Sequence, residues 1–243
     1  QKMHTYKSSV GANVMPHNVH VLGDFLVISY YADGIRIVDA SQPDVLVEVG
    51  YLDTSDYEGS GSRGCWGAYP FLASGNILAN DRDNGLFILS PNYQHAAYLQ
   101  GKITNSQTNE GISNVNIALI GVAKTWESQL NGQYKLGLAT AGEYAIVCSK
   151  YAYESQVINS TLISDSLRVL DIALNPYPIF NLDLKVQDSL SQTAIANTWL
   201  NIEHSQAMYE LQSNEQGKAQ VMNLYNDEFK LWANHWGYLP YYE

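Results

Sequence analysis

Residues 25–39, FLVISYYADGIRIVD, contain two short apolar runs on either side of an Asp-Gly pair at positions 33 and 34. Both runs are rich in β-branched and aromatic residues, and Asp-Gly between two such runs is typical of a tight hairpin. The pattern continues in both directions along the chain. We expect one antiparallel sheet made of Val19–Leu22, Phe25–Tyr31, Ile35–Asp39 and Val45–Tyr51.

A second group of strands is expected after the Ser- and Gly-rich loop Thr54–Gly64. Its members are Trp66–Phe71, Asn76–Asn80 and Leu86–Leu89, separated by turn residues. Sheets of three or four short strands have the size of propeller blades, and a closed propeller needs about four or more blades. The sequence therefore predicts an all-β fold class in which residues 1–97 are the C-terminal blades of a partial β-propeller.

Residues 13–91 also resemble a known family. Pro16–Val21, Ser29–Asp39 and Trp66–Leu78 are similar to segments of the LVIVD-repeat propellers of the choice-of-anchor B family. This resemblance implies a secreted bacterial protein that is exported to, or anchored at, the outer membrane. It transfers no catalytic residue to this chain.

Residues 98–243 contain an internal repeat. Gly101–Thr104 corresponds to Leu184–Gln187, and Asn131–Tyr134 corresponds to Gln216–Ala219, with an offset that rises from 83 to 85. Two copies of about 80 residues have the size of small Ig-like β-sandwiches. The first copy resembles a carboxypeptidase regulatory-like domain, a name that implies no peptidase activity. We expect domain boundaries at 1–97, 98–175 and 176–243, with the third domain a diverged copy of the second.

The repeat makes a local prediction about two turns. The register continues where Gly142–Ile146 is matched with Asp227–Leu231. It places Gly132 and Gly217 in corresponding turns, where the missing Cβ permits a positive φ.

Composition limits the function classes. The 243 residues carry 13 Lys and Arg against 24 Asp and Glu, a formal net charge of −11. Such a chain lacks the cationic surface that nucleic acid or an anionic membrane requires. Only 15% of residues are charged while 18 are Tyr, which favours an extracellular protein. Cys65 and Cys148 are expected to be free thiols in separate modules.

Candidate catalytic residues are few. His17 and His20 are three residues apart, so on one strand their side chains point to opposite faces and do not share a metal ion without a bulge. No Gly-x-Ser-x-Gly nucleophile motif is present. Arg63 near Cys65 could lower the pKa of that thiol, but no histidine is close in sequence. We expect no enzymatic activity and no cofactor.

One loop has the oxygen density of a calcium site. Asp81 and Asp83 lie in the sequence DRDNG at positions 81–85, but the later bidentate acid of an EF-type loop is missing. The same residues between two apolar runs indicate a hairpin turn. The sequence is compatible with a bound Ca²⁺ ion at this loop and equally with a simple turn.

Aromatic residues crowd the last part of the chain. Trp232, Trp236, Tyr238 and Tyr241 have polar neighbours, a combination that suits sugar stacking or a protein interface. The alternative is that Trp232 and Trp236 belong to the core of the last sandwich. These four residues are the candidate ligand-binding side chains.

The function predicted from these observations is that of a secreted or bacterial cell-surface multidomain scaffold. It would bind a partner protein or an extracellular polymer without catalysis, as part of a longer chain or a larger surface assembly. The alternative is a glycan-binding protein, or a glycan-active enzyme whose active site lies in propeller blades outside this chain.

Overall fold

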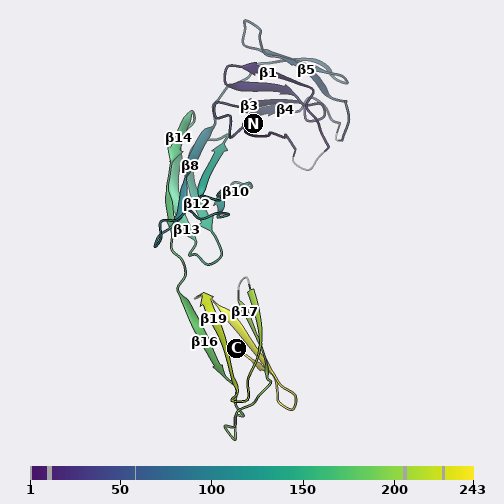
Figure 1. The fold of residues 1–243 in the computed structure, drawn as a ribbon. Helices are drawn as coiled ribbons and strands as arrows, with labels where there is room; N and C mark the ends of the chain where they lie inside the picture. The colour runs from purple at the N-terminus through teal and green to yellow at the C-terminus, as the bar shows by residue number, and fades with distance from the viewer. Residues whose placement is uncertain (1, 10–12, 58, 205–206, 226–227) are drawn as a thin grey trace. The chain divides into compact units, whose positions relative to one another are not determined.

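The computed structural model describes residues 2–9, 13–57, 59–204, 207–225 and 228–243. Its regular elements are 21 strands, and none of the described residues forms a helix that could cross a membrane. The chain divides into two compact units (Figure 1). The first comprises residues 1–104, 110–148 and 157–172, and the second comprises residues 105–109, 149–156 and 173–243.

Two antiparallel sheets open the first unit. The first has the order β1-β2-β3-β4 and the second the order β5-β6-β7. The strands predicted from the sequence are confirmed, with ends displaced by a few residues: β1 (Asn18–Leu22), β2 (Phe25–Ser29), β3 (Ile35–Asp39), β4 (Val47–Leu52), β5 (Cys65–Tyr69), β6 (Ile77–Asp81) and β7 (Gly85–Leu89).

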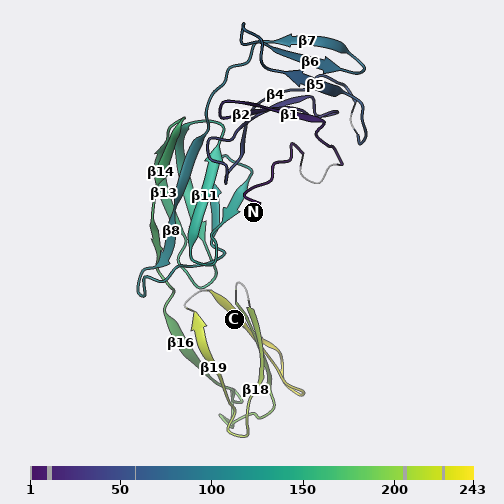
Figure 2. The same ribbon diagram turned by 45° about the horizontal axis from the view of Figure 1, so that its top comes forward.

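The predicted propeller is wrong, because no ring of blades closes among the described residues, where the two sheets pack against each other as a single pair (Figure 2). Phe25 and Val27 of the first sheet share one core cluster with Ile77 and Ala79 of the second. The opposite face of the first sheet is covered by the N-terminal segment, through Tyr6 and other side chains. Short strands with tight turns fit stacked sheets as well as blades, so only the packing distinguishes the two.

Asp39 at the end of β3 connects these sheets to the next domain. Its buried carboxylate accepts hydrogen bonds from the backbone N–H groups of Ser41 (2.8 Å) and Ala96 (2.7 Å), and lies 3.2 Å from Nδ1 of His95. Burial alone would raise the pKa of Asp39, but the two backbone donors outweigh it and hold the pKa below its usual 3.8. The carboxylate therefore fixes the start of the next strand, β8 (Ala97–Asn105).

The first sandwich has two layers. One sheet has the order β10-β9-β12-β13, and the other has the order β11-β8-β14, with β15 also paired to β8. β14 runs parallel to β8, whereas β11 pairs with β8, and β10 with β9, in antiparallel ladders. Its strands are β8 (Ala97–Asn105), β9 (Asn116–Leu119), β10 (Thr125–Glu127), β11 (Gln133–Leu138), β12 (Gly142–Ser149), β13 (Gln156–Leu162), β14 (Ser166–Val169) and β15 (Ile172–Leu174).

The C-terminal sandwich repeats most of this topology. A four-stranded sheet with the order β18-β17-β20-β21 faces a two-stranded sheet of β16 and β19, and Ile202, Val221 and Leu224 form its core. The strands appear in the chain order of β8 to β13 of the first sandwich: β16 (Ile179–Lys185), β17 (Trp199–His204), β18 (Ala207–Gln212), β19 (Lys218–Tyr225), β20 (Phe229–Asn234) and β21 (Tyr241–Tyr242).

The predicted equivalence of Gly132 and Gly217 is confirmed. Their φ angles are +82° and +69°. The N–H of Ile103 donates to the carbonyl of Gly132 at 2.8 Å, and the N–H of Val186 donates to the carbonyl of Gly217 at 2.7 Å. Asp227, part of the matched register, lies outside the described residues. The boundaries at 97/98 and 175/176 stay predictions.

A substitution at Gly132 tests this turn. A Cβ there would lie 2.3 Å from the carbonyl oxygen of Ile103, whereas a Cβ on Gly121, at φ +86°, meets nothing within 4 Å. Gly121→Ala should lower the free energy of unfolding by about 1 kcal/mol, because the alanine is held in the left-handed conformation but meets no neighbouring atom. Gly132→Ala should cost about 2–4 kcal/mol because it adds a backbone clash. Urea unfolding of both variants measures the difference, and equal losses would contradict this account of the turn.

Candidate functional site

A cleft of about 720 Å³ opens in the C-terminal sandwich. Its apolar floor comes from both sheets, with Leu184 on β16, Leu200 on β17, and Leu231 and Ala233 on β20. Its rim carries His235, Tyr238, Leu239, Pro240 and Tyr241, together with Lys185 and Gln187 from the opposite side. An apolar hollow with a few polar groups at its edge is the usual form of a binding site.

The turn after β20 places the aromatic part of the rim. Gly237 adopts φ +89°, and the N–H of Tyr238 donates to the carbonyl of His235 at 3.2 Å. The chain then returns so that Tyr241 on β21 pairs with Ala233 on β20. The rings of His235 and Tyr238 meet edge to face with centroids 5.5 Å apart. This one turn therefore gathers the aromatic side chains at the mouth of the cleft.

Thr198 is the polar exception in the wall of the cleft. The residue is only 2% exposed, and its hydroxyl has no hydrogen-bond partner. Its backbone N–H is satisfied by Oγ of Ser213 at 3.0 Å. The equivalent position in the first sandwich is Val115, whose N–H is held by Ser128 in the same way. A buried hydroxyl without a partner costs about 1–3 kcal/mol, so its presence beside a cleft suggests a role toward a ligand.

The four predicted aromatic residues separate into two groups. Tyr238 and Tyr241 line the cleft, whereas Trp232 and Trp236 do not. Leu231 and Ala233 point into the cleft, so Trp232 between them faces the other side of the sheet. Trp236 is 94% exposed, so the alternative that it belongs to the core is wrong.

Sequence reasoning missed the half of the cleft that comes from distant segments. Leu184 and Thr198 lie more than 30 residues before the aromatic cluster and carry no motif. The repeat itself contained one difference between its copies that pointed to this part of the second sandwich. The second copy has Leu184 where the first has Gly101, and Ala219 where the first has Tyr134.

The carboxylates of Asp81 and Asp83 already have partners. Asp81 is buried, accepts hydrogen bonds from the N–H groups of Asp83 and Asn84, each at 2.9 Å, and accepts one from Thr54 Oγ1 at 2.7 Å. Asp83 pairs with Arg63 at 3.3 Å. Within the described ranges, no three His, Cys, Asp or Glu side chains group as a metal site requires. The calcium site stays a prediction without geometric support.

The other candidate residues have structural surroundings. His17 stacks on Trp66 with ring centroids 4.8 Å apart, and His20 contacts the edge of Phe71. Cys65 and Cys148 are free and buried, as predicted. Burial raises the pKa of both thiols to about 11, with the charge of Asp81 adding to the shift at Cys65. Neither thiol is therefore a nucleophile at neutral pH.

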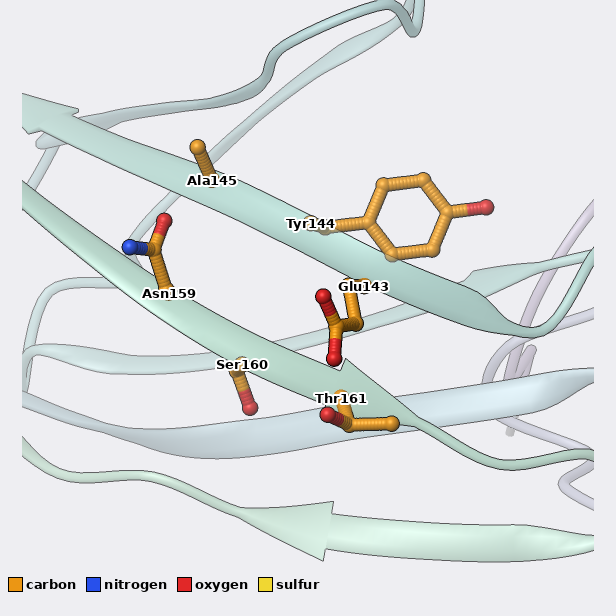
Figure 3. A pocket seen from close by; sticks show the side chains of 6 residues that line it. All are labelled: Glu143, Tyr144, Ala145, Asn159, Ser160 and Thr161. Carbon is orange, nitrogen blue, oxygen red and sulfur yellow. The ribbon is translucent and has the colours of Figure 1, made fainter.

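A second, polar hollow of about 410 Å³ lies between β12 and β13 of the first sandwich (Figure 3). It is lined by Glu143, Tyr144, Ala145, Asn159, Ser160 and Thr161, and the Glu143 carboxylate points toward β13 in the figure. The hydroxyl of Ser160 is buried without a partner. None of the lining residues is a histidine, lysine or cysteine that could serve as a base or nucleophile with this serine.

Replacing the cleft threonine tests whether its hydroxyl is unsatisfied. Thr198→Val restores the residue type of Val115 with nearly the same shape, so the protein should gain about 1 kcal/mol of stability. Ser213→Ala is the matched control, because it removes a hydroxyl that holds the N–H of Thr198 and should lose about 1–2 kcal/mol. Both are measured by urea unfolding. A clear loss of stability in Thr198→Val would show that the hydroxyl has a partner.

Comparison with known proteins supports the predicted family resemblance for one part of the chain. Residues 99–178 match the family model of the CarboxypepD_reg-like domain, about a third of the chain. This confirms the resemblance predicted for the first sandwich. The resemblance of residues 13–91 to the choice-of-anchor B family received no support, in agreement with the absence of a propeller. A search of curated proteins gave no match.

Several solved structures show a weak overall likeness. The Streptococcal ancillary pilin is 12% identical, with 93% of this chain and 75% of that chain covered and a TM-score of 0.49. The shaft pilin SpaA of Lactobacillus rhamnosus GG is 9% identical, with 58% and 87% covered and a TM-score of 0.33. The Bacillus anthracis TIE protein is 12% identical, with 96% and 54% covered and a TM-score of 0.33. At scores below 0.5 these likenesses carry no conclusion about function.

Proposed function

We propose that this protein is a non-catalytic scaffold of the bacterial cell surface or extracellular space, which binds a partner through the cleft of its C-terminal sandwich. The observation that carries the proposal is the cleft itself. Its floor is the half-open core of a sandwich, and its rim presents His235, Tyr238 and Tyr241. Such a surface, apolar with an aromatic border, is the kind that partners cover.

The chemistry of the rest of the molecule supports a binding role over catalysis. Both cysteines are buried with raised pKa values, and the aspartates of the candidate calcium loop are engaged in hydrogen bonds. With the predicted domain limits at 97/98 and 175/176, the chain would consist of one module of two sheets followed in sequence by two sandwiches, the make-up expected of a multidomain scaffold. The extracellular location rests on the acidic, Tyr-rich composition with few charged residues.

Surface exposure of the protein on its own cells tests the location. Protease added to intact cells should digest the protein while a cytoplasmic marker survives, because a surface scaffold lies outside the permeability barrier. Immunoblotting of cells and culture medium gives the result. Protection in intact cells, with digestion only after lysis, would contradict the proposal.

Glycan binding is the second candidate function, favoured by the two tyrosines in the rim. Aromatic faces bordered by polar groups stack on sugar rings. The alternative of a glycan-active enzyme assumed an active site in further propeller blades. It loses its basis because the predicted propeller is wrong.

Affinity electrophoresis on a panel of soluble polysaccharides separates glycan binding from protein attachment. If the cleft binds glycan, a polymer should retard the wild type, and Tyr241→Ala should abolish most of the retardation. Trp236→Ala is the matched control, because this exposed side chain lies outside the cleft. Retardation lost in Trp236→Ala alone would place the glycan site elsewhere, and no retardation on any polymer would exclude a glycan from the panel as ligand.

A further inference from the structure

Strand β13 is an outermost strand of the first sandwich. Its sheet has the order β10-β9-β12-β13, so one edge of β13 lies beside β12 (Figure 3), and no strand from the described part of the chain pairs with the other edge. This sandwich lies inside the chain, and β14 and β15 follow β13 before the C-terminal sandwich begins. The free edge of β13 therefore does not depend on where the sequence ends.

The other outer strands of this sandwich are protected against further pairing. Glu127 lies on β10, Lys135 on β11 and Arg168 on β14. Charged side chains on an edge strand oppose the approach of another strand. β15 is uncharged but only three residues long, and the carbonyl of Ala173 in it accepts a hydrogen bond from Nε2 of Gln156 at 2.6 Å.

β13 is longer than these strands and carries no charge. Its seven residues, Gln156–Leu162, have the sequence QVINSTL, without a charged residue, proline or glycine. Val157 on its outward face is 62% exposed. Uncharged segments of about six or seven residues with β-branched side chains are the kind that pair with further strands. β13 is therefore the edge of this sandwich that is best suited to accept another strand.

The sequence of β13 suits pairing with itself. In an antiparallel pair of two copies that has Asn159 opposite Asn159, Val157 of each copy lies opposite Thr161 of the other. These three side chains are on the exposed face of the strand, so they form one row across both copies. Two β-branched residues then face each other on each side of the central asparagines, which is a favourable cross-strand pair.

The charges that flank β13 do not oppose this pairing. The nearest ones are those of Glu154 before the strand and Asp165 after it. In the register centred on Asn159, Glu154 lies opposite Ser164 and Asp165 lies opposite Tyr153. No two like charges meet within residues 153–165. A two-fold contact needs a surface that is complementary to itself, and this edge fulfils that condition.

We propose that β13 pairs with β13 of a second copy of this chain, antiparallel and about a two-fold axis at Asn159. The two four-stranded sheets then form one continuous sheet across the two copies. A ladder of two seven-residue strands buries less than the about 1,200–2,000 Å² of a stable specific complex, so the contact is weak and reversible. None of the β13 residues lines the cleft of the proposed function, so the two surfaces are separate.

Sedimentation velocity over a series of concentrations measures this pairing. The wild type should shift from monomer to dimer as its concentration rises. Asn159→Lys should weaken the dimer by about ten-fold or more, because two ammonium groups then lie opposite each other at the axis. Asn116→Lys is the matched control, since Asn116 is also exposed and lies in the same sheet on β9, and it should leave the dimer unchanged.

A mixture of two charge variants tests the register. Asn159→Glu should also be monomeric by itself, because two carboxylates then meet. An equimolar mixture of Asn159→Lys and Asn159→Glu should form dimers again, because opposite charges face each other at the axis. Such a recovery shows that both variants are folded. A wild type that stays monomeric, or a mixture without recovery, would overturn the proposal.

Disulfide trapping gives a second readout of the axis. Residues directly opposite in an antiparallel pair have Cβ atoms close enough for a disulfide. Cys65 and Cys148 are buried, so mild oxidation of Asn159→Cys should link two copies through the new thiol. Asn116→Cys should link far more slowly. Equal rates for the two variants would show random encounters and would contradict pairing at β13.

The cleft variant Tyr241→Ala separates this inference from the proposed function. It should dimerise like the wild type, because Tyr241 lies in the C-terminal sandwich. Loss of the dimer in Tyr241→Ala, with Asn159→Lys still dimeric, would assign self-association to the cleft and overturn pairing through β13.

Discussion

The contact between the Leu170 carbonyl and Gly101 holds the segment before β15 against β8 in the first sandwich. In the first sandwich the absent side chain of Gly101 lets a main-chain oxygen lie over β8, and Tyr134 holds it with a 2.6 Å hydrogen bond. This crossing allows β15 to pair with β8 and to bury Ile172 and Leu174. The C-terminal sandwich has Leu184 at the corresponding position of β16, opposite Ala219, so it lacks both the glycine and the tyrosine of this contact.

The volume of the paired positions is nearly conserved between the copies. Tyr134 lies opposite Gly101, and Leu184 lies opposite Ala219. A large and a small residue therefore face each other in both sheets, but their order is exchanged. Such volume-conserving exchanges keep a β-sandwich stable while they change which neighbouring segment can approach the sheet. The repeat thus keeps the volume at this pair of positions while it exchanges the large and the small residue.

The shared skeleton depends on a few polar contacts that repeat with the sequence offset. Ser128 accepts a hydrogen bond from the N–H of Val115 at 2.9 Å and donates to the carbonyl of Ile112 at 2.6 Å. Ser213 makes the corresponding contacts with Thr198 and Ile195 at 3.0 and 2.7 Å. These serines satisfy backbone groups at the end of the sandwich, where no ladder can reach them. The two serines thus make the same local contacts in both copies, although the family pattern of the second copy has diverged.

Local periodicity, turn residues and spacing were enough to predict the all-β class, the strands of residues 18–89, the free cysteines and the register of the repeat. It predicted the aromatic cluster that supplies Tyr238 and Tyr241 to the rim of the cleft. The tertiary structure was needed to show that the first two sheets form a stacked pair and not part of a closed ring, since alternating strands with tight turns are compatible with both. It alone brought Leu184 and Thr198 to the same cleft as Tyr241 and turned Trp232 away from it. Strand pairing over long separations sets those neighbours, and no local sequence pattern encodes it.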